Sequence, residues 1–207
     1  MSEVSLWRGR APLILASKSA ARRALLEGIG VPFEAMDAKV DEREAEAPLR
    51  GNGAAASDIA IHLACAKALA VSGKMPGRLV IGADQVLALG TRLFTKPANL
   101  SEAATQLALL SGKTHELHSA LCVARDGEIL LQAVPIARLT CRTLSQDFIE
   151  AYVQAAGEAL LGSVGAYQIE GLGVHLFERV EGDHATILGL PLLPLLSFLR
   201  EEGSLCG

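Results

Sequence analysis

The 207-residue sequence is poor in aromatic residues, with one Trp, two Tyr and five Phe. Half of its residues are hydrophobic, so a core of Leu, Ile, Val and Ala can form without disulfides or structural metals. The scarcity of aromatics removes the stacking surfaces that single-stranded nucleic-acid binders use. The net charge of −4, from 19 basic and 23 acidic side chains, further argues against a protein that coats nucleic acid through bulk electrostatics.

Signals for disulfides, export and membrane insertion are also missing. None of the four cysteines forms a CxxC pair, which is typical of buried or incidental thiols in a reducing compartment. The first ten residues lack an apolar signal core, and the most hydrophobic stretch, 187–199, is too short to span a bilayer. The five histidines show no metal-ligand spacing. We expect a soluble, cytoplasmic protein whose histidines are structural or exposed.

The pattern of apolar residues predicts alternating strands and helices. In the first half we expect strands at 13–16, 33–36 and 79–82, helices at 19–28 and 54–71, and an acidic loop at 41–48. In the second half we expect helices from 99 to 112, 145 to 156 and 192 to 200, and strands at 116–124, 129–140 and 174–180. The turn Asp126-Gly127 would join the first two of these strands. We predict an α/β fold with a mixed, elongated sheet, flanking helices and two lobes around a central cleft, in a single domain covering 1–207.

A cluster of hydroxyls and guanidinium groups follows the first predicted strand. Ser17, Ser19 and Arg22 lie where that strand gives way to a helix, and free N–H groups at a helix start favour anions. An ordinary N-cap followed by solvated arginines explains the same residues equally well. The segment is not a P-loop, because its glycines and the Gly-Lys-Ser/Thr ending are absent.

Two acidic positions are candidates for catalysis or metal binding. Asp84 follows the buried strand 79–82, and a carboxylate at the carboxyl end of such a strand is well placed at a cleft. Glu42, within Asp41-Glu42, could hold a divalent cation through its oxygens, although a solvated acidic loop is the more common role. Lys67 and Lys96 could each meet a phosphate as point charges, but lone lysines more often lie at the surface.

Three glycines surround Glu170 in the segment 165–173. Such glycines suggest either close approach of backbone to a ligand or a tight turn before the last strand. The sequence alone does not separate the two interpretations.

In combination and in order, these motifs resemble the Maf family of nucleotide pyrophosphatases. The resemblance covers about residues 13–199, nearly the whole chain. The motifs that carry it are Leu15-Ala16-Ser17-Lys18-Ser19-Ala20-Ala21-Arg22, Val40-Asp41-Glu42, Ala66-Lys67-Ala68, Gly82-Ala83-Asp84, Lys96-Pro97, Leu110 to His115, Glu170-Gly171-Leu172-Gly173 and Gly189-Leu190-Pro191-Leu192.

The resemblance implies a fold related to the inosine triphosphatases, a homodimer, Mg²⁺ or Mn²⁺, and hydrolysis of a nucleoside triphosphate to the monophosphate and pyrophosphate. It implies that Asp84 accepts a proton and binds metal together with Glu42. Ser17, Ser19, Arg22, Lys67 and Lys96 would contact the phosphates. A non-catalytic nucleotide sensor linked to septum formation is the rival hypothesis, but a sensor has no use for a carboxylate beside its anionic ligand.

Within the family, the chain resembles the branch acting on 7-methyl-GTP more than the dTTP/UTP branch. Gln85 follows Asp84 where the dTTP/UTP branch has Thr, and Glu170 stands where that branch has Gln. Both residues are therefore expected to contact the base. Ala21 occupies a position that is Trp in the methyl-GTP branch, so the cationic base loses an aromatic partner and methyl selectivity is expected to be looser.

Overall fold

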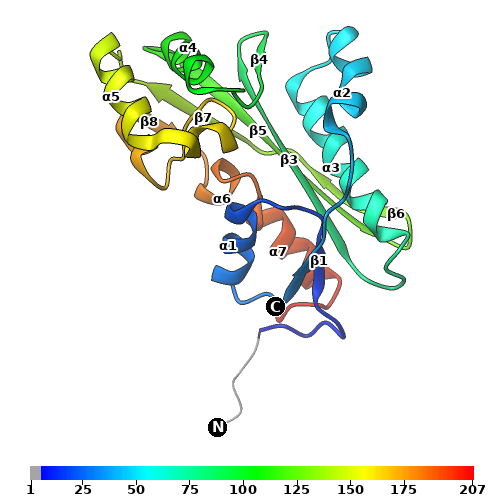
Figure 1. Cartoon of the computed structure of the whole chain (residues 1–207). Helices are drawn as coiled ribbons and strands as arrows, with labels where there is room; N and C mark the ends of the chain where they lie inside the picture. The colour runs from blue at the N-terminus through cyan, green and yellow to red at the C-terminus, as the bar shows by residue number, and fades with distance from the viewer. Residues whose placement is uncertain (1–5) are drawn as a thin grey trace. The chain divides into compact units, whose positions relative to one another are not determined.

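The computed structural model describes residues 6–207 and divides them into two compact units (Figure 1). The first unit comprises residues 6–85, 119–135 and 184–207, and the second comprises 86–118 and 136–183. Strands β3 (Val80–Leu89) and β5 (Thr114–Arg125) contribute residues to both.

The first unit is built from parallel strands, one β-hairpin and helices on both faces of the sheet. Strand β1 (Leu13–Leu15) pairs in parallel with β2 (Phe33–Ala35) and with the start of β3, while the end of β5 pairs antiparallel with β6 (Glu128–Ala133). Its helices are α1 (Ala20–Gly28), α2 (Glu42–Gly51), α3 (Ala56–Ser72), α6 (His184–Ile187) and α7 (Leu192–Glu201).

The alternation of side chains along β1 determines which helices cover each face of this sheet. Leu13 and Leu15 pack in a core with residues of α1 and α7, which lie beside β1 in Figure 1. Ile14 points the other way and packs with Val71 of α3. The strand is therefore buried on both sides, which explains its uninterrupted apolar sequence.

The second unit carries antiparallel strands and its own helices. The end of β3 pairs with β4 (Arg92–Phe94), the start of β5 pairs with β7 (Ile136–Cys141), and β7 pairs with β8 (Phe177–Glu181). Its helices are α4 (Leu100–Leu110), α5 (Gln146–Ala156) and the 3₁₀ segments η1 (Gly157–Gly162) and η2 (Leu172–Leu176). The eight strands form one mixed sheet in the order β2-β1-β3-β5-β7-β8, with β4 on β3 and β6 on β5, so the predicted α/β class is confirmed.

The acidic segment predicted as a loop is a helix. Asp41 caps α2 by accepting a hydrogen bond from the Glu44 backbone N–H at 3.1 Å, and acidic residues occupy its first turn. Acidic side chains at this end are favoured by the helix dipole. The prediction failed because high polarity was taken as evidence of a loop, although Glu, Arg and Ala are good helix formers.

The sequence predicted that the strand before Asp84 ends at Gly82, and this was wrong. Strand β3 continues through Val86-Leu87-Ala88 to Leu89. The apolar residues beyond Gln85 keep the strand pattern until the turn at Gly90, which has a positive φ of 60°. Asp84 therefore projects from the middle of a long strand rather than from its end.

Two predicted strands of the second half are also revised. The segment 129–140 is broken at Val134-Pro135 into β6 and β7, because proline has no N–H for the ladder. The segment 174–180 begins as η2 and becomes extended only at Phe177. The turn Asp126-Gly127 is confirmed, and both residues have positive φ values, of 53° and 83°.

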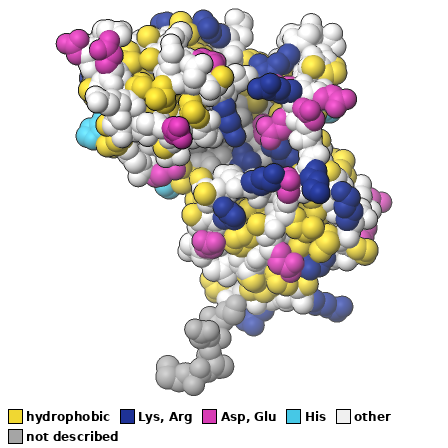
Figure 2. Space-filling model, viewed as in Figure 1, with side chains coloured by type: hydrophobic (Ala, Val, Ile, Leu, Met, Phe, Trp, Pro, Cys, Tyr) yellow, Lys and Arg dark blue, Asp and Glu magenta, His cyan; other side chains and the backbone are white. Residues whose placement is uncertain are grey.

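Two further features of the molecule are the apolarity of its helices and the distribution of charge on one face. Within residues 6–207, no helix combines the length and apolarity needed to cross a bilayer. On the face drawn in Figure 2, basic and acidic side chains are interspersed.

Candidate active site

The candidate site of the first unit is organised by the two faces of β3. Asp84 has the same parity along the strand as Val80 and Gly82, so it faces α3. Gln85 has the opposite parity, shared with Ile81 and Ala83, and faces the side covered by α1 and α7.

Two carboxylates meet at one buried ammonium group. The Nζ atom of Lys67 on α3 lies 2.6 Å from Oδ1 of Asp84 and 2.6 Å from Oε1 of Glu42 at the start of α2. The side chains of Lys67 and Asp84 are 9% and 11% exposed, whereas that of Glu42 is 52% exposed. Burying the ammonium is tolerable because two opposite charges compensate it.

Gly82 allows α3 to approach β3 closely enough for this contact. A Cβ atom at position 82 would overlap the carbonyl oxygen of Ala64 and would lie 2.7 Å from the backbone nitrogen of Ala68. Glycine on the strand and small alanines on the helix therefore bring the two backbones together. The motif Gly82-Ala83-Asp84 and the alanines around Lys67 act as one packing unit.

Arg22 on α1 is fixed by three acceptors. Its Nε donates to the Gly189 carbonyl at 2.8 Å, and its Nη1 donates to the Ala83 carbonyl at 2.7 Å and to Ser17 Oγ at 3.3 Å. Burial lowers the pKa of Arg22, and the nearby charges of Asp84 and Glu42 oppose that shift. Among the described residues Nη2 has no hydrogen-bond partner, so it remains a donor for a ligand.

The two serines before α1 have different roles. Ser19 is the N-cap, and its Oγ accepts from the Arg22 backbone N–H at 3.4 Å, as the sequence predicted. Ser17 Oγ accepts from the Ser19 N–H at 3.2 Å and from Arg22. Because both bonds use Ser17 as an acceptor, its hydroxyl hydrogen is left to donate to an anion.

Gln85 holds the segment that carries Gly189. Its Nε2 lies 2.8 Å from Ser119 Oγ, 3.2 Å from the Thr186 carbonyl and 3.0 Å from the Ile187 carbonyl. Ser119 Oγ also donates to the Thr186 carbonyl at 2.6 Å. Two carbonyl acceptors fix the amide orientation, since the flipped form would set oxygen against oxygen. Gln85 can therefore offer a ligand only its carbonyl oxygen.

Ser119 and Thr186 were missed by sequence reasoning. A buried serine within the apolar run of β5 was the available signal for Ser119, because such a hydroxyl requires a partner. Nothing in the sequence connects position 186 with position 85.

Lys96 and Glu170 belong to the second unit, so the cluster described above is formed without them. Lys96 follows β4 and is exposed, and Glu170 is exposed in the segment before η2. Of the nine predicted site residues, the first unit brings together the seven that it contains: Ser17, Ser19, Arg22, Glu42, Lys67, Asp84 and Gln85.

The glycines around Glu170 shape a tight turn. The Gln168 carbonyl accepts from the N–H groups of Gly171 and Gly173, and a Cβ atom at 173 would collide with residue 168. Gly165 and Ala166 have positive φ values of 79° and 57°. These contacts account for the glycines without a ligand.

The donor set suits a hard divalent cation. Glu42 and Asp84 converge on one point of positive charge, and Mg²⁺ is commonly held by one or two carboxylates with water and substrate phosphates completing its shell. Among residues 6–207, no group of three or more His, Cys, Asp or Glu side chains could hold an ion by itself. The two carboxylates therefore fit an ion that arrives with a phosphate ligand.

Fold and cluster together define an α/β protein with a carboxylate–lysine–arginine site suited to a phosphorylated ligand. A family model described as Maf-like protein matches residues 12–202, and the chain belongs to this family.

Several proteins similar to this chain are named as pyrophosphatases. A nucleoside triphosphate pyrophosphatase of Nitrobacter winogradskyi is 54% identical over 200 residues, covering 96% of this chain and 98% of its own. Another, from Bradyrhizobium diazoefficiens, is 56% identical over 199 residues, with the same coverage. A 7-methyl-GTP pyrophosphatase of Rhizobium etli is 53% identical over 195 residues, covering 94% of this chain and 98% of its own.

Proposed function

We propose that this protein hydrolyses a nucleoside triphosphate to the monophosphate and pyrophosphate, with Asp84 as the proton acceptor. The observation that carries the proposal is the contact of Lys67 with both Asp84 and Glu42, beside the fixed guanidinium of Arg22. The pyrophosphatase names of relatives at 52–56% identity support the same activity.

Different residues of the first unit would bind the phosphates and accept the proton during phosphoanhydride hydrolysis. That reaction requires positioning and charge stabilisation more than covalent help. Arg22, held by three acceptors, and the Ser17 hydroxyl would bind phosphate oxygens without reorganising. Asp84 uses Oδ1 for Lys67, so Oδ2 is the atom that would take the proton of the attacking water.

For Lys67 we propose a role other than the phosphate contact that the family resemblance implied. It holds two carboxylates rather than projecting freely as a phosphate ligand. We assign it to orienting Asp84 and Glu42 and to offsetting their repulsion before substrate arrives. Mg²⁺ or Mn²⁺, held by Glu42 and Asp84, would supply a Lewis acid for the phosphate charge.

A guanine nucleotide, with 7-methyl-GTP as the leading candidate, is the substrate that we propose. Gln85 presents only an acceptor, and Glu170 is a carboxylate, so both match the N–H donors on the pairing edge of guanine. The name of the Rhizobium etli relative supports this choice. The alternative is a dTTP/UTP pyrophosphatase. We further propose a cytoplasmic homodimer, which light scattering and cell fractionation would test.

The test is a panel of 7-methyl-GTP, GTP, dTTP and UTP, each with Mg²⁺ and with Mn²⁺, with all products separated by anion exchange. The proposal predicts equal amounts of monophosphate and pyrophosphate, fastest with a guanine nucleotide. Release of diphosphate and orthophosphate would contradict it. Tight binding without turnover would instead favour the nucleotide sensor.

A further inference from the structure

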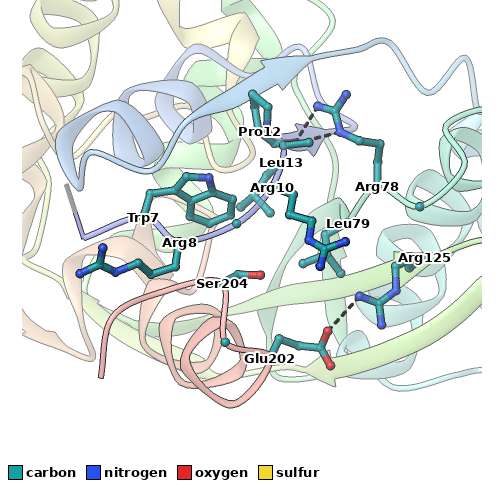
Figure 3. A pocket seen from close by; sticks show the side chains of 14 residues that line it. Trp7, Arg8, Arg10, Pro12, Leu13, Arg78, Leu79, Arg125, Glu202 and Ser204 are labelled. Atoms are coloured by element: carbon teal, nitrogen blue, oxygen red, sulfur yellow. Dashed lines mark hydrogen bonds and ion pairs between the residues drawn. The ribbon is translucent and has the colours of Figure 1, made fainter.

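A cationic pocket lies near the start of β1 and β3, apart from the candidate active site. This pocket, with a volume of about 320 Å³, is lined by residues 7–13, 77–79, Arg125 and 202–204, all in the first unit (Figure 3). None of these residues belongs to the cluster around Asp84. Leu79 precedes β3 and Asp84 lies five residues later, so roughly 15 Å of strand separates the two sites.

The lining of the pocket is basic. Arg8, Arg10, Arg78 and Arg125 line it together with one acidic residue, Glu202. The side chain of Arg8 extends away from the pocket, so the arginines that face it, counted against Glu202 and Glu34, the partner of Arg78, leave an excess of one positive charge. Arginines from three distant segments therefore produce a local cationic site on a chain whose net charge is −4.

Two of these arginines are held in place by the fold. Arg78 donates through Nε and Nη2 to the Pro12 carbonyl, at 3.0 and 2.6 Å, and Nη2 also pairs with Glu34 at 2.9 Å. Arg125 uses Nη1 for Glu202 at 2.9 Å, which leaves its other nitrogens available. They form a preorganised wall.

The guanidinium groups of Arg8 and Arg10 both lack a partner among the described residues, and Arg10 is the one directed into the pocket. Within the described part of the chain, no hydrogen bond or ion pair of its guanidinium is found, and the residue is exposed. Figure 3 shows its side chain extending into the space near Leu79 and Arg125, whereas that of Arg8 extends away. An unpaired guanidinium directed into a hollow is suited to a bidentate anion.

The two ends of the chain build the remaining wall. Backbone N–H groups of Arg8 and Gly9 donate to the Ser204 carbonyl at 2.9 and 3.1 Å, and Trp7 forms a bridge with Leu205. The indole of Trp7 lies against Gly9, where a Cβ atom would collide with the ring. The pocket therefore has a rigid apolar side next to its charged side.

From these observations we infer that the pocket binds a compact phosphate-bearing anion, with Arg10 and Arg125 as its ligands. Guanidinium forks match phosphate oxygens, and a volume near 320 Å³ is at the small end of ligand pockets. The ligand is thus no larger than a mononucleotide. Inorganic pyrophosphate and a nucleoside monophosphate share this chemistry, and the test separates them.

Trp7 provides a direct readout, because it is the chain's only tryptophan and lines the pocket. Pyrophosphate and GMP are titrated separately into the full-length protein, and indole fluorescence is followed at fixed ionic strength. A saturable change is expected with at least one of them. Arg10→Gln should weaken that binding by about tenfold or more, the scale of one lost charged hydrogen bond.

Arg200→Gln is the matched control, since Arg200 is an exposed arginine on α7 that does not line the pocket. It should leave the affinity within about twofold, whereas a general field effect would weaken binding equally in both variants. Arg10→Gln should also keep wild-type triphosphate hydrolysis, which separates this site from the proposed active site. No saturable signal, or equal losses in Arg10→Gln and Arg200→Gln, would overturn the inference.

Discussion

The two units bury polar side chains in contrasting ways. In the first unit, Lys67 and Asp84 are buried as an ion pair in contact with the half-exposed Glu42. In the second unit, His115 is fully buried and its Nε2 lies 2.7 Å from the hydroxyl of Tyr167. Burial lowers the pKa of His115 to about 4 and raises that of Tyr167 well above its ordinary value, so this pair is neutral near pH 7.

The difference separates a reactive cluster from a structural one. A buried neutral pair offers little to a charged substrate, whereas a charged cluster open to solvent through Glu42 can exchange partners with a cation or phosphate. His115 belongs to the motif Leu110 to His115 that suggested the family, yet its surroundings, Tyr167 and Phe177, are aromatic. Membership of a motif therefore does not imply a chemical role.

Lys67→Met is expected to have the largest effect on the charged cluster of Lys67, Asp84 and Glu42. Two carboxylates would then face each other without their shared cation, and we expect turnover to fall by about 100-fold, the scale of losing one preorganised electrostatic contact. Pyrophosphate release under saturating substrate measures the effect. Lys74→Met, at an exposed lysine just beyond α3, should stay near wild type. Turnover above half of wild type in Lys67→Met would remove the lysine from the mechanism.

Glu170→Gln tests whether a residue of the second unit determines which nucleotide base the enzyme prefers. The change replaces two acceptors by one acceptor and one donor, so activity should shift toward pyrimidines by ~10–100-fold, as for one good bidentate base contact. The readout is kcat/KM for 7-methyl-GTP, GTP, dTTP and UTP. Glu158→Gln, at another exposed glutamate of this unit, is the control. An unchanged ranking of substrates would show that Glu170 does not read the base.

Gly82→Ala tests the packing on which the charged cluster depends. The added Cβ must displace α3 backbone rather than a flexible side chain, so we expect a loss of roughly 2–3 kcal/mol in the free energy of unfolding. Gly73→Ala is matched, because Gly73 caps the same helix at φ −64° and has no atom within 4 Å of the added carbon. Urea denaturation of both variants gives the comparison. Equal stabilities would mean that α3 and β3 are not in tight contact.

The neutral pair predicts a pH dependence of stability with a defined sign. The pKa of His115 is about 4 when folded and 6.5 as the ordinary value, so the unfolded chain binds more protons between these limits. His115 should therefore contribute up to about 3 kcal/mol above pH 6.5, and that contribution should disappear as pH falls toward 4. His115→Phe should flatten this slope in urea unfolding between pH 4.5 and 7, and His62→Gln, at an exposed histidine, should retain it. If His115→Phe leaves the pH dependence of the free energy of unfolding unchanged, another group is responsible for it.

Local signals predicted much of the fold. Ser19, Asn99 and Ser145 each cap the helix that they were expected to begin. The first strand and the final helix were also found from the apolar pattern. The loop predicted at 41–48 was wrong because the polarity of the segment was given more weight than the helix propensity of its residues. The early end predicted for β3 was wrong because Asp84 was taken as the end of the strand although apolar residues follow it. The single domain over 1–207 remains a prediction.

The sequence could predict which residues belong to the site, but not which of them contact each other. The sequence grouped Arg22, Lys67 and Asp84 through motif order, whereas the direct Lys67–Asp84 contact depends on the glycine that lets α3 approach β3. The link from Gln85 to Thr186 spans 101 residues and has no local signal. Long-range contacts of this kind need the fold itself.

The most direct test of the account is Asp84→Asn against Asp58→Asn, an exposed aspartate near the start of α3. Pyrophosphate release from the preferred triphosphate and thermal unfolding are measured on both proteins. Asp84→Asn should lose about 100-fold or more in turnover, the scale of a positioned base, while keeping a cooperative melt. Asp58→Asn should match wild type in both. Near wild-type turnover in Asp84→Asn would contradict the assignment of Asp84 as the proton acceptor.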